Sequence, residues 1–111
     1  MEQGCNYNLV YVTAASSEQA VALGRAAVEA RLAACANVLP GITAIYRWEG
    51  VVRQDSEAAL LLKTRADLVE PLVAKLREWH SYDCPCVVAL PILAGNPAFL
   101  EWIGQETRSP G

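Results

Sequence analysis

The sequence has 111 residues, of which 53% are hydrophobic and 19% charged, and its formal net charge is −3. A chain of this length forms one domain, and the absence of a basic run argues against a nucleic-acid partner. It contains no run of 18 apolar residues and no signal-peptide pattern, so we expect neither a membrane partner nor export.

The low share of charged residues favours an oligomer over the alternative, an unusually apolar monomer. The four cysteines are not spaced as a disulfide framework or a zinc ribbon. We therefore expect reduced thiols in a cytoplasmic protein, at Cys5, Cys35, Cys84 and Cys86.

The first part of the chain predicts a strand followed by a helix. Residues 1–8 are interpreted as a flexible lead-in, and residues 9–13 (LVYVT) as a short, central strand. Ser16 and Gln19 form a capping-box pattern that opens a helix to about Arg31. Its small face, with Gly24 beside several alanines, predicts close packing on a sheet.

Residues 34–64 predict a long, bent β-hairpin. Apolar side chains recur at every second residue from Ile42 to Trp48, and Glu49–Gly50 is typical of a type I′ turn. Counting outward pairs Trp48 with Val51, Arg47 with Val52, and Tyr46 with Arg53, the last as a cation–π pair. Pro40–Gly41 marks a bend or bulge. Arms this long are expected to extend beyond the domain and to contact another chain.

A second helix is predicted after this hairpin, with Thr64 and Asp67 as cap residues and an apolar face running from Leu68 to Trp79. A strand is predicted at residues 87–90, and Asn96 and Pro97 start a last short helix. Residues 107–111 are expected to fray, which leaves a single domain over residues 9–106.

The order of elements is typical of an α+β, ferredoxin-like βαββαβ fold, extended by the long hairpin and the short C-terminal helix. Two helices then cover one face of an antiparallel sheet. The other face stays bare unless another chain packs on it, which again predicts an oligomer.

The chain carries no glycine-rich phosphate loop and no GxSxG motif, so no enzyme is predicted. The metal-capable side chains His80, Asp83, Cys84 and Cys86 are close in sequence, and thiolates favour Cu(I). For the cysteines, including Cys35, burial in the core is the alternative to ligation.

Asp55 and Glu57 share one face of a strand, and they are interpreted as a solvated edge.

Several runs of the sequence together resemble the CutA family, the divalent-cation tolerance proteins. They are residues 31–38 (RLAACANV), 40–50 (PGITAIYRWEG), 60–65 (LLLKTR), 80–85 (HSYDCP) and 95–103 (GNPAFLEWI). The resemblance extends from about residue 9 to residue 106.

The resemblance implies a homotrimer similar to the PII signalling proteins, with Tyr46, Trp48 and Arg53 at the interface. It also implies a link to copper binding and to tolerance of divalent ions, without an established enzymatic reaction. His80 and Cys35 match family positions. Val12 occupies the position of a copper-linked cysteine found in some members, and Cys86 stands where a carboxylate is common.

Two functions remain open from the sequence. The first is a trimeric, non-enzymatic protein that binds copper or another soft metal ion. The second is a PII-like scaffold that binds a small ligand or a partner protein in clefts between subunits. For the first, we predict a metal site built from an outward-facing His80 with Cys84 or Cys86.

Overall fold

The computed structural model describes residues 6–109. Four strands and three α-helices follow one another in the predicted order: β1 (Tyr7–Ala14), α1 (Ser17–Glu29), β2 (Cys35–Trp48), β3 (Val51–Arg65), α2 (Val69–Trp79), β4 (Val87–Pro91) and α3 (Pro97–Glu106). A short 3₁₀ turn, Ala66–Leu68, leads into α2. Within residues 6–109, no helix is long and apolar enough to cross a membrane.

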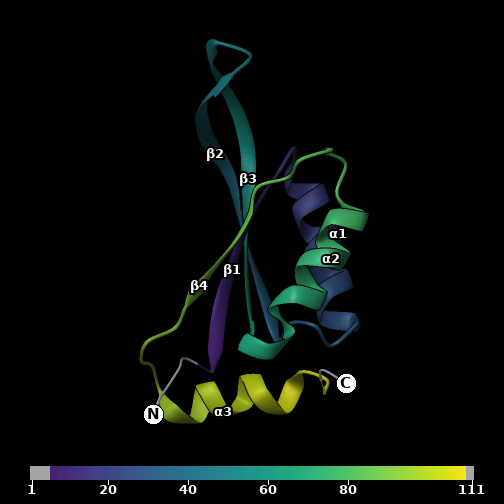
Figure 1. The fold of residues 1–111 in the computed structure, drawn as a ribbon, viewed down its shortest axis with the longest axis vertical. Coiled ribbons are helices and arrows are strands. Elements are labelled where there is room, and N and C mark those ends of the chain that lie inside the picture. Colours follow the sequence, from purple (N-terminus) through teal and green to yellow (C-terminus); the bar gives the residue numbers. More distant parts are fainter. Residues whose placement is uncertain (1–5, 110–111) are drawn as a thin grey trace.

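The strands form one antiparallel sheet in the order β2-β3-β1-β4, as expected for a ferredoxin-like fold. Helices α1 and α2 lie on the same face of this sheet, and α3 lies across its lower end (Figure 1). The predicted α+β class and topology are therefore confirmed.

The core lies between the sheet and these two helices. Alternate residues of the strands point into it and are fully buried, among them Val10, Val12, Leu60 and Leu62. Helix α1 comes very close to the sheet at Gly24, where an added Cβ would lie 2.9 Å from the Cβ of Ala36. The small face predicted for this helix is thus required by its packing.

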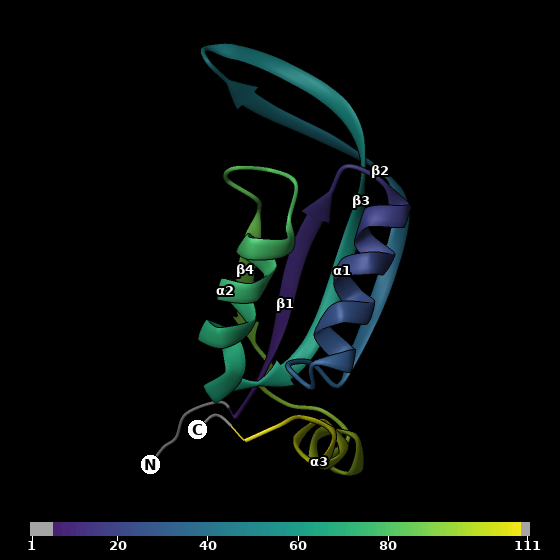
Figure 2. The ribbon, with the colours of Figure 1, turned by 90° about the vertical axis from the view of Figure 1, so that its right-hand side faces the viewer.

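The hairpin of β2 and β3 has the predicted register and turn. Trp48 pairs with Val51, Arg47 with Val52, and Tyr46 with Arg53. Glu49 and Gly50 have φ angles of 49° and 80°, as a type I′ turn requires. The two strands are 14 and 15 residues long, and their outer half bends away beyond the rest of the domain (Figure 2).

A β-bulge at Pro40–Gly41 lies where the hairpin leaves the domain. Leu39 pairs with Ala59 and Ile42 with Glu57, so two residues of β2 stand opposite one residue of β3. The extra residue shifts by one position the alternation of the β2 side chains between the two faces of the sheet. Ile42 therefore continues the sheet face that Leu39 occupies, and the apolar series up to Trp48 lies on that same face.

Several predictions about the ends of elements were wrong. The first strand begins at Tyr7, inside the predicted lead-in, and residues 1–5 lie outside the described part of the chain. Thr64 does not cap α2: it belongs to β3, where its buried hydroxyl donates to the carbonyl of Leu32 at 2.6 Å. Asp67 instead pairs with Arg65 at 2.7 Å.

The predicted fraying is also wrong at its first residue. Thr107 is buried and its hydroxyl donates to the carbonyl oxygen of Ile103 at 2.9 Å. The backbone N–H of Arg108 donates to Arg31 at 2.8 Å. The bond to Arg31 holds the chain beside the end of α1, and residues 110–111 lie outside the described part.

The proposed cation–π pair of Tyr46 and Arg53 does not form, although the two residues are cross-strand partners. The hydroxyl of Tyr46 donates to Asp55 instead. Within the described residues, the cation that lies over an aromatic ring is Lys63, 5.9 Å from the ring centre of Phe99.

The sheet face opposite the helices is apolar and open in the single chain. Large apolar side chains along it are about half exposed, including Leu39, Val88 and Leu90. The outer part of the hairpin adds Ile45, Trp48, Val51 and Val52, each more than half exposed. A single subunit therefore leaves two large apolar surfaces, the open sheet face and the hairpin, in contact with water.

Candidate functional site

The segment from His80 to Cys86 joins α2 to β4, and we call it the 80–86 loop. It lies at the upper end of the sheet, beneath the bent hairpin (Figure 2). The backbone of Thr13 holds both of its ends: the Thr13 carbonyl lies 2.7 Å from Nε2 of His80, and the Thr13 N–H donates to the carbonyl of Cys86 at 3.3 Å. The loop is thus fixed to the end of β1.

His80 is buried, with 8% of its surface exposed, so the prediction that it faces outward was wrong. Its Nδ1 accepts a hydrogen bond from the backbone N–H of Tyr82 at 3.1 Å. Because Nδ1 accepts, the neutral ring carries its proton on Nε2 and donates it to Thr13. Neither nitrogen has a lone pair left for a metal ion.

Tyr82 connects the loop to the base of the hairpin. Its ring lies 4.7 Å from that of His80, centre to centre, and its hydroxyl donates to Oε2 of Glu57 at 2.9 Å. Burial raises the pKa of Tyr82 to about 12, with further contributions from this hydrogen bond and from the negative charge of Glu57. Tyr82 therefore stays a neutral donor across the physiological pH range.

A second tyrosine–carboxylate pair lies further along the hairpin. Tyr46 donates to Asp55, and this hydrogen bond is the main cause that raises the pKa of Tyr46. Asp55 and Glu57, interpreted from the sequence as a solvated edge, thus each accept a tyrosine hydroxyl. A further hydrogen bond joins α1 to the 80–86 loop, since the side-chain amide of Gln19 donates to Ser81 at 2.7 Å.

The predicted metal ligands do not come together. Within residues 6–109, no three His, Cys, Asp or Glu side chains are placed to hold one ion. Cys84 and Cys86 are exposed, so the alternative of core burial does not apply to them. Cys35 belongs to the other end of the sheet: it pairs with Lys63, which pairs with Leu9, whereas the 80–86 loop is held at Thr13.

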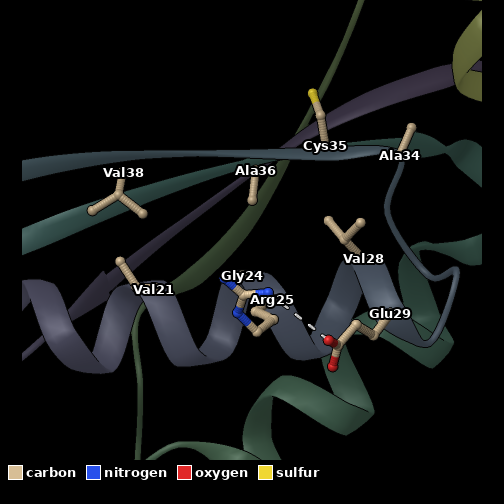
Figure 3. Close-up of a pocket in the computed structure, with 9 residues that line it drawn as sticks. All are labelled: Val21, Gly24, Arg25, Val28, Glu29, Ala34, Cys35, Ala36 and Val38. Carbon is tan, nitrogen blue, oxygen red and sulfur yellow. Dashed lines mark ion pairs between the residues drawn. The ribbon is translucent and has the colours of Figure 1, made fainter.

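A shallow apolar groove of about 480 Å³ runs between α1 and the first half of β2. Figure 3 shows Ala36 and Val38 pointing toward the helix, while the sulfur of Cys35 points to the opposite side of the strand. The exposed ion pair of Arg25 and Glu29, at 4.0 Å, lies at its rim. The residues that line the groove include no nucleophile paired with a base.

Sequence reasoning missed the contacts made by Thr13, Gln19 and Tyr82. These contacts join residues 67, 62 and 25 positions apart in the chain. Two of them involve the backbone carbonyl of Thr13 and the side-chain amide of Gln19, and no spacing in the sequence indicates these contacts. The signal that was available is the alternation of Asp55 and Glu57, which placed both carboxylates on one face.

Comparisons with known proteins identify the family of this chain. The family model described as CutA1 divalent ion tolerance protein matches residues 8–106. The protein CutA, chloroplastic, of Arabidopsis thaliana is 46% identical over 101 residues, which cover 91% of this chain and 56% of that protein. The divalent-cation tolerance protein CutA of Thermus thermophilus is 43% identical, with 89% and 96% covered. The chain thus spans about half the length of several curated relatives that it matches, and nearly all of the Thermus protein.

Solved structures show the same fold. The divalent cation tolerance protein of Thermus thermophilus superposes with a TM-score of 0.89 at 42% identity, covering 92% of this chain and 99% of that one. CutA1 of Oryza sativa gives a TM-score of 0.90 at 41% identity, covering 95% and 96%. On the family match, the identities and the shared fold, this chain belongs to the CutA family of divalent-cation tolerance proteins.

Proposed function

We propose that the protein acts as a homotrimeric, non-enzymatic component of divalent-cation tolerance. The observation that carries this proposal is the pair of apolar surfaces that one subunit leaves uncovered, the open sheet face and the bent hairpin. Family membership supplies the link to divalent cations.

The two surfaces are different parts of the subunit, so a contact between the hairpin of one copy and the sheet of the next is head-to-tail. Contacts of this kind close into a ring when the rotation between copies permits it. A ring of three, as the resemblance to CutA implies, would cover all three sheets and all three hairpins.

The test is growth under metal stress. Cells of the source organism that lack the gene should become more sensitive to Cu²⁺ or Zn²⁺, and the wild-type gene should restore growth. Leu61 lies between the core-facing Leu60 and Leu62 of β3, so its side chain belongs to the open sheet face. A Leu61→Asp variant, which places a charge on that face, should fail to restore growth. Equal metal sensitivity with and without the gene would contradict the proposal.

For the metal itself, we propose binding of Cu(I) at the exposed thiols of Cys84 and Cys86, which lie on one loop. Thiolates are soft ligands that select Cu(I) over harder divalent ions. The His80-centred site does not fit the structure, because both ring nitrogens already bond to the backbone. Cys35 belongs to the opposite end of the sheet and is not a ligand in this proposal.

Competition of the protein with a Cu(I) chelator tests this assignment. We expect the Cys84→Ser/Cys86→Ser variant to lose the bound ion, while Cys35→Ser, as a matched control, retains it. Retention of Cu(I) by the double variant would assign the ion elsewhere.

A further inference from the structure

We propose that Tyr82 and Glu57 form a latch that fixes the angle of the outer hairpin, residues 42–57, before a partner copy of the chain binds it. The latch is the hydrogen bond from the Tyr82 hydroxyl to Oε2 of Glu57, at 2.9 Å. Its role in assembly rests on the proposed trimer, whereas the hinge that it controls belongs to the single chain and is tested separately.

The first observation is a hinge at the base of the outer hairpin. Strand β1 pairs with β3 as far as Ala58, opposite Ala14, and beyond this point the described part of β3 pairs with β2 alone. The bulge at Pro40–Gly41 lies at the same level, and a Cβ added to Gly41 would meet no atom within 4 Å. A two-stranded ribbon is at best marginally stable by itself in water, so the strands alone do not fix the angle of this one.

The second observation is the point at which the latch is attached. Glu57 pairs with Ile42, the first pair beyond the bulge, so the bond from Tyr82 reaches the outer hairpin at its hinge. Among the side-chain hydrogen bonds and ion pairs of residues 6–109, no other joins residues 42–57 to the rest of the chain. Figure 2 shows the hairpin bent over the 80–86 loop, which carries Tyr82.

The third observation is that the other end of the latch is fixed to the sheet. The Tyr82 ring lies 4.7 Å from that of the buried His80, and the Tyr82 N–H donates to Nδ1 of His80 at 3.1 Å. Nε2 of His80 lies 2.7 Å from the carbonyl oxygen of Thr13 in β1. The Tyr82 hydroxyl therefore has a defined position relative to β1, and a bond to it holds Glu57 in place.

A small rotation at the hinge has a large effect at the end of the hairpin. At about 3.3 Å per residue, the strand spans about 20 Å from Ile42 to Trp48, so a rotation of about 10° moves Trp48 by about 3–4 Å. Apolar contacts need heavy atoms within about 4–4.5 Å, so this rotation removes the exposed Trp48 from a surface that it fits. A latch that raises the fraction of subunits with the correct angle therefore strengthens and accelerates assembly in proportion.

The hinge is tested by the distance between two spin labels, measured by electron paramagnetic resonance. Cysteines that replace the exposed Gln54 on β3 and Arg77 on α2 carry the labels, and the four native cysteines of the full-length chain are replaced by serine. Trp48→Ala and Leu61→Asp disfavour assembly, and size exclusion isolates the single-chain fraction. Circular dichroism verifies that this fraction is folded.

In this parent protein we expect one narrow distance distribution, which broadens when Tyr82→Phe or Glu57→Ala is added. Tyr46→Phe is the matched control, because it removes the same kind of hydrogen bond, to Asp55, from within the hairpin. It should leave the distribution narrow. Equal widths in the parent and in Tyr82→Phe would overturn the proposal.

The second test uses the natural sequence without labels. Refolding from urea is followed by light scattering at several protein concentrations, so that the concentration-dependent assembly phase is resolved. Tyr82→Phe and Glu57→Ala should each slow this phase by about tenfold, the value of one hydrogen bond to a charged group. The double variant should be no slower than either single variant. Glu57→Gln, which keeps an oxygen acceptor, should assemble faster than Glu57→Ala.

Two results of the second test would contradict the latch. They are an assembly rate unchanged by Tyr82→Phe, and independent, multiplying effects of the two substitutions in the double variant. A structural role of Tyr82 alone would lower the stability of the subunit without this dependence on Glu57. A wild-type protein that stays a single chain contradicts the proposed trimer instead, and the label distances then decide whether the latch fixes the hinge.

Discussion

The imidazole of His80 uses both of its nitrogens to join backbone groups of β1 and of its own loop. The tilted ring of Tyr82 packs against that ring, and its hydroxyl donates to Glu57. The histidine thus positions the loop that carries the two exposed thiols. His80, whose imidazole is a common metal ligand in proteins, therefore has a structural role here. The thiols of Cys84 and Cys86 face solvent and are not engaged by the fold.

Replacing His80 by alanine should lower the free energy of unfolding by about 0.5–1.5 kcal/mol for each of the two hydrogen bonds that are lost. The partners are the carbonyl of Thr13 and the N–H of Tyr82. Urea denaturation measures the change. Ser81→Ala is the control, since it removes only the exposed bond to Gln19, and it should cost less. An unchanged midpoint for His80→Ala would show that the ring does not hold the loop.

Tyr82 gives a pH dependence whose sign follows from its pKa, which is raised from 10.0 to about 12 in the folded protein. Between these values the unfolded chain loses the phenolic proton and the folded one keeps it. Stability from this group is therefore complete below pH 10 and is lost as the pH rises toward 12. The difference in melting temperature between wild type and Tyr82→Phe should shrink over this interval. A constant difference would mean that the tyrosine titrates normally.

Most of the helices and strands were predictable, because turn residues and the alternation of apolar side chains mark them in the sequence. The turn at Glu49–Gly50, the bulge at Pro40–Gly41 and the alternation from Ile42 to Trp48 gave the hairpin register. The burial and hydrogen-bond partners of Thr64 and His80 were not predictable, because each side chain bonds a backbone carbonyl distant in sequence. Local patterns locate strands and turns, whereas long-range hydrogen bonds depend on how those elements pack.

Gly24 tests the packing of α1 on the sheet. Alanine favours helices by about 1 kcal/mol over glycine, but here its Cβ would lie 2.9 Å from the Cβ of Ala36, which is tied to the backbone of β2. We expect Gly24→Ala to destabilise the protein by about 1–3 kcal/mol through this overlap. Thermal unfolding measures it. Stabilisation by the variant would mean that helix and sheet separate easily.

Trp48 tests the role of the hairpin in assembly. It is 55% exposed in one subunit, so its removal should leave the fold of the subunit unchanged. Truncation of a large aromatic residue that becomes buried costs about 3–5 kcal/mol. Trp48→Ala should therefore shift dissociation of the proposed trimer to higher protein concentrations, measured by sedimentation. Thr43→Ala, elsewhere on the same arm, is the control. Identical dissociation of all three proteins would remove Trp48 from the interface.

At the scale of the whole molecule, the fold leaves the sheet covered on one side only. The buried core lies between the sheet and helices α1 and α2, while the opposite face and the hairpin remain apolar and exposed. This imbalance was predictable from the element order and the low share of charged residues. Which surfaces meet, and in what geometry, depends on a second copy of the chain.

The mass of the native protein in solution tests the proposed assembly most directly. Light scattering at micromolar concentration should give three times the 12.0 kDa of one chain, and the value should stay constant over a broad range of dilution. A mass equal to one chain at these concentrations would contradict the account, because the open sheet face and the hairpin would then both remain in water.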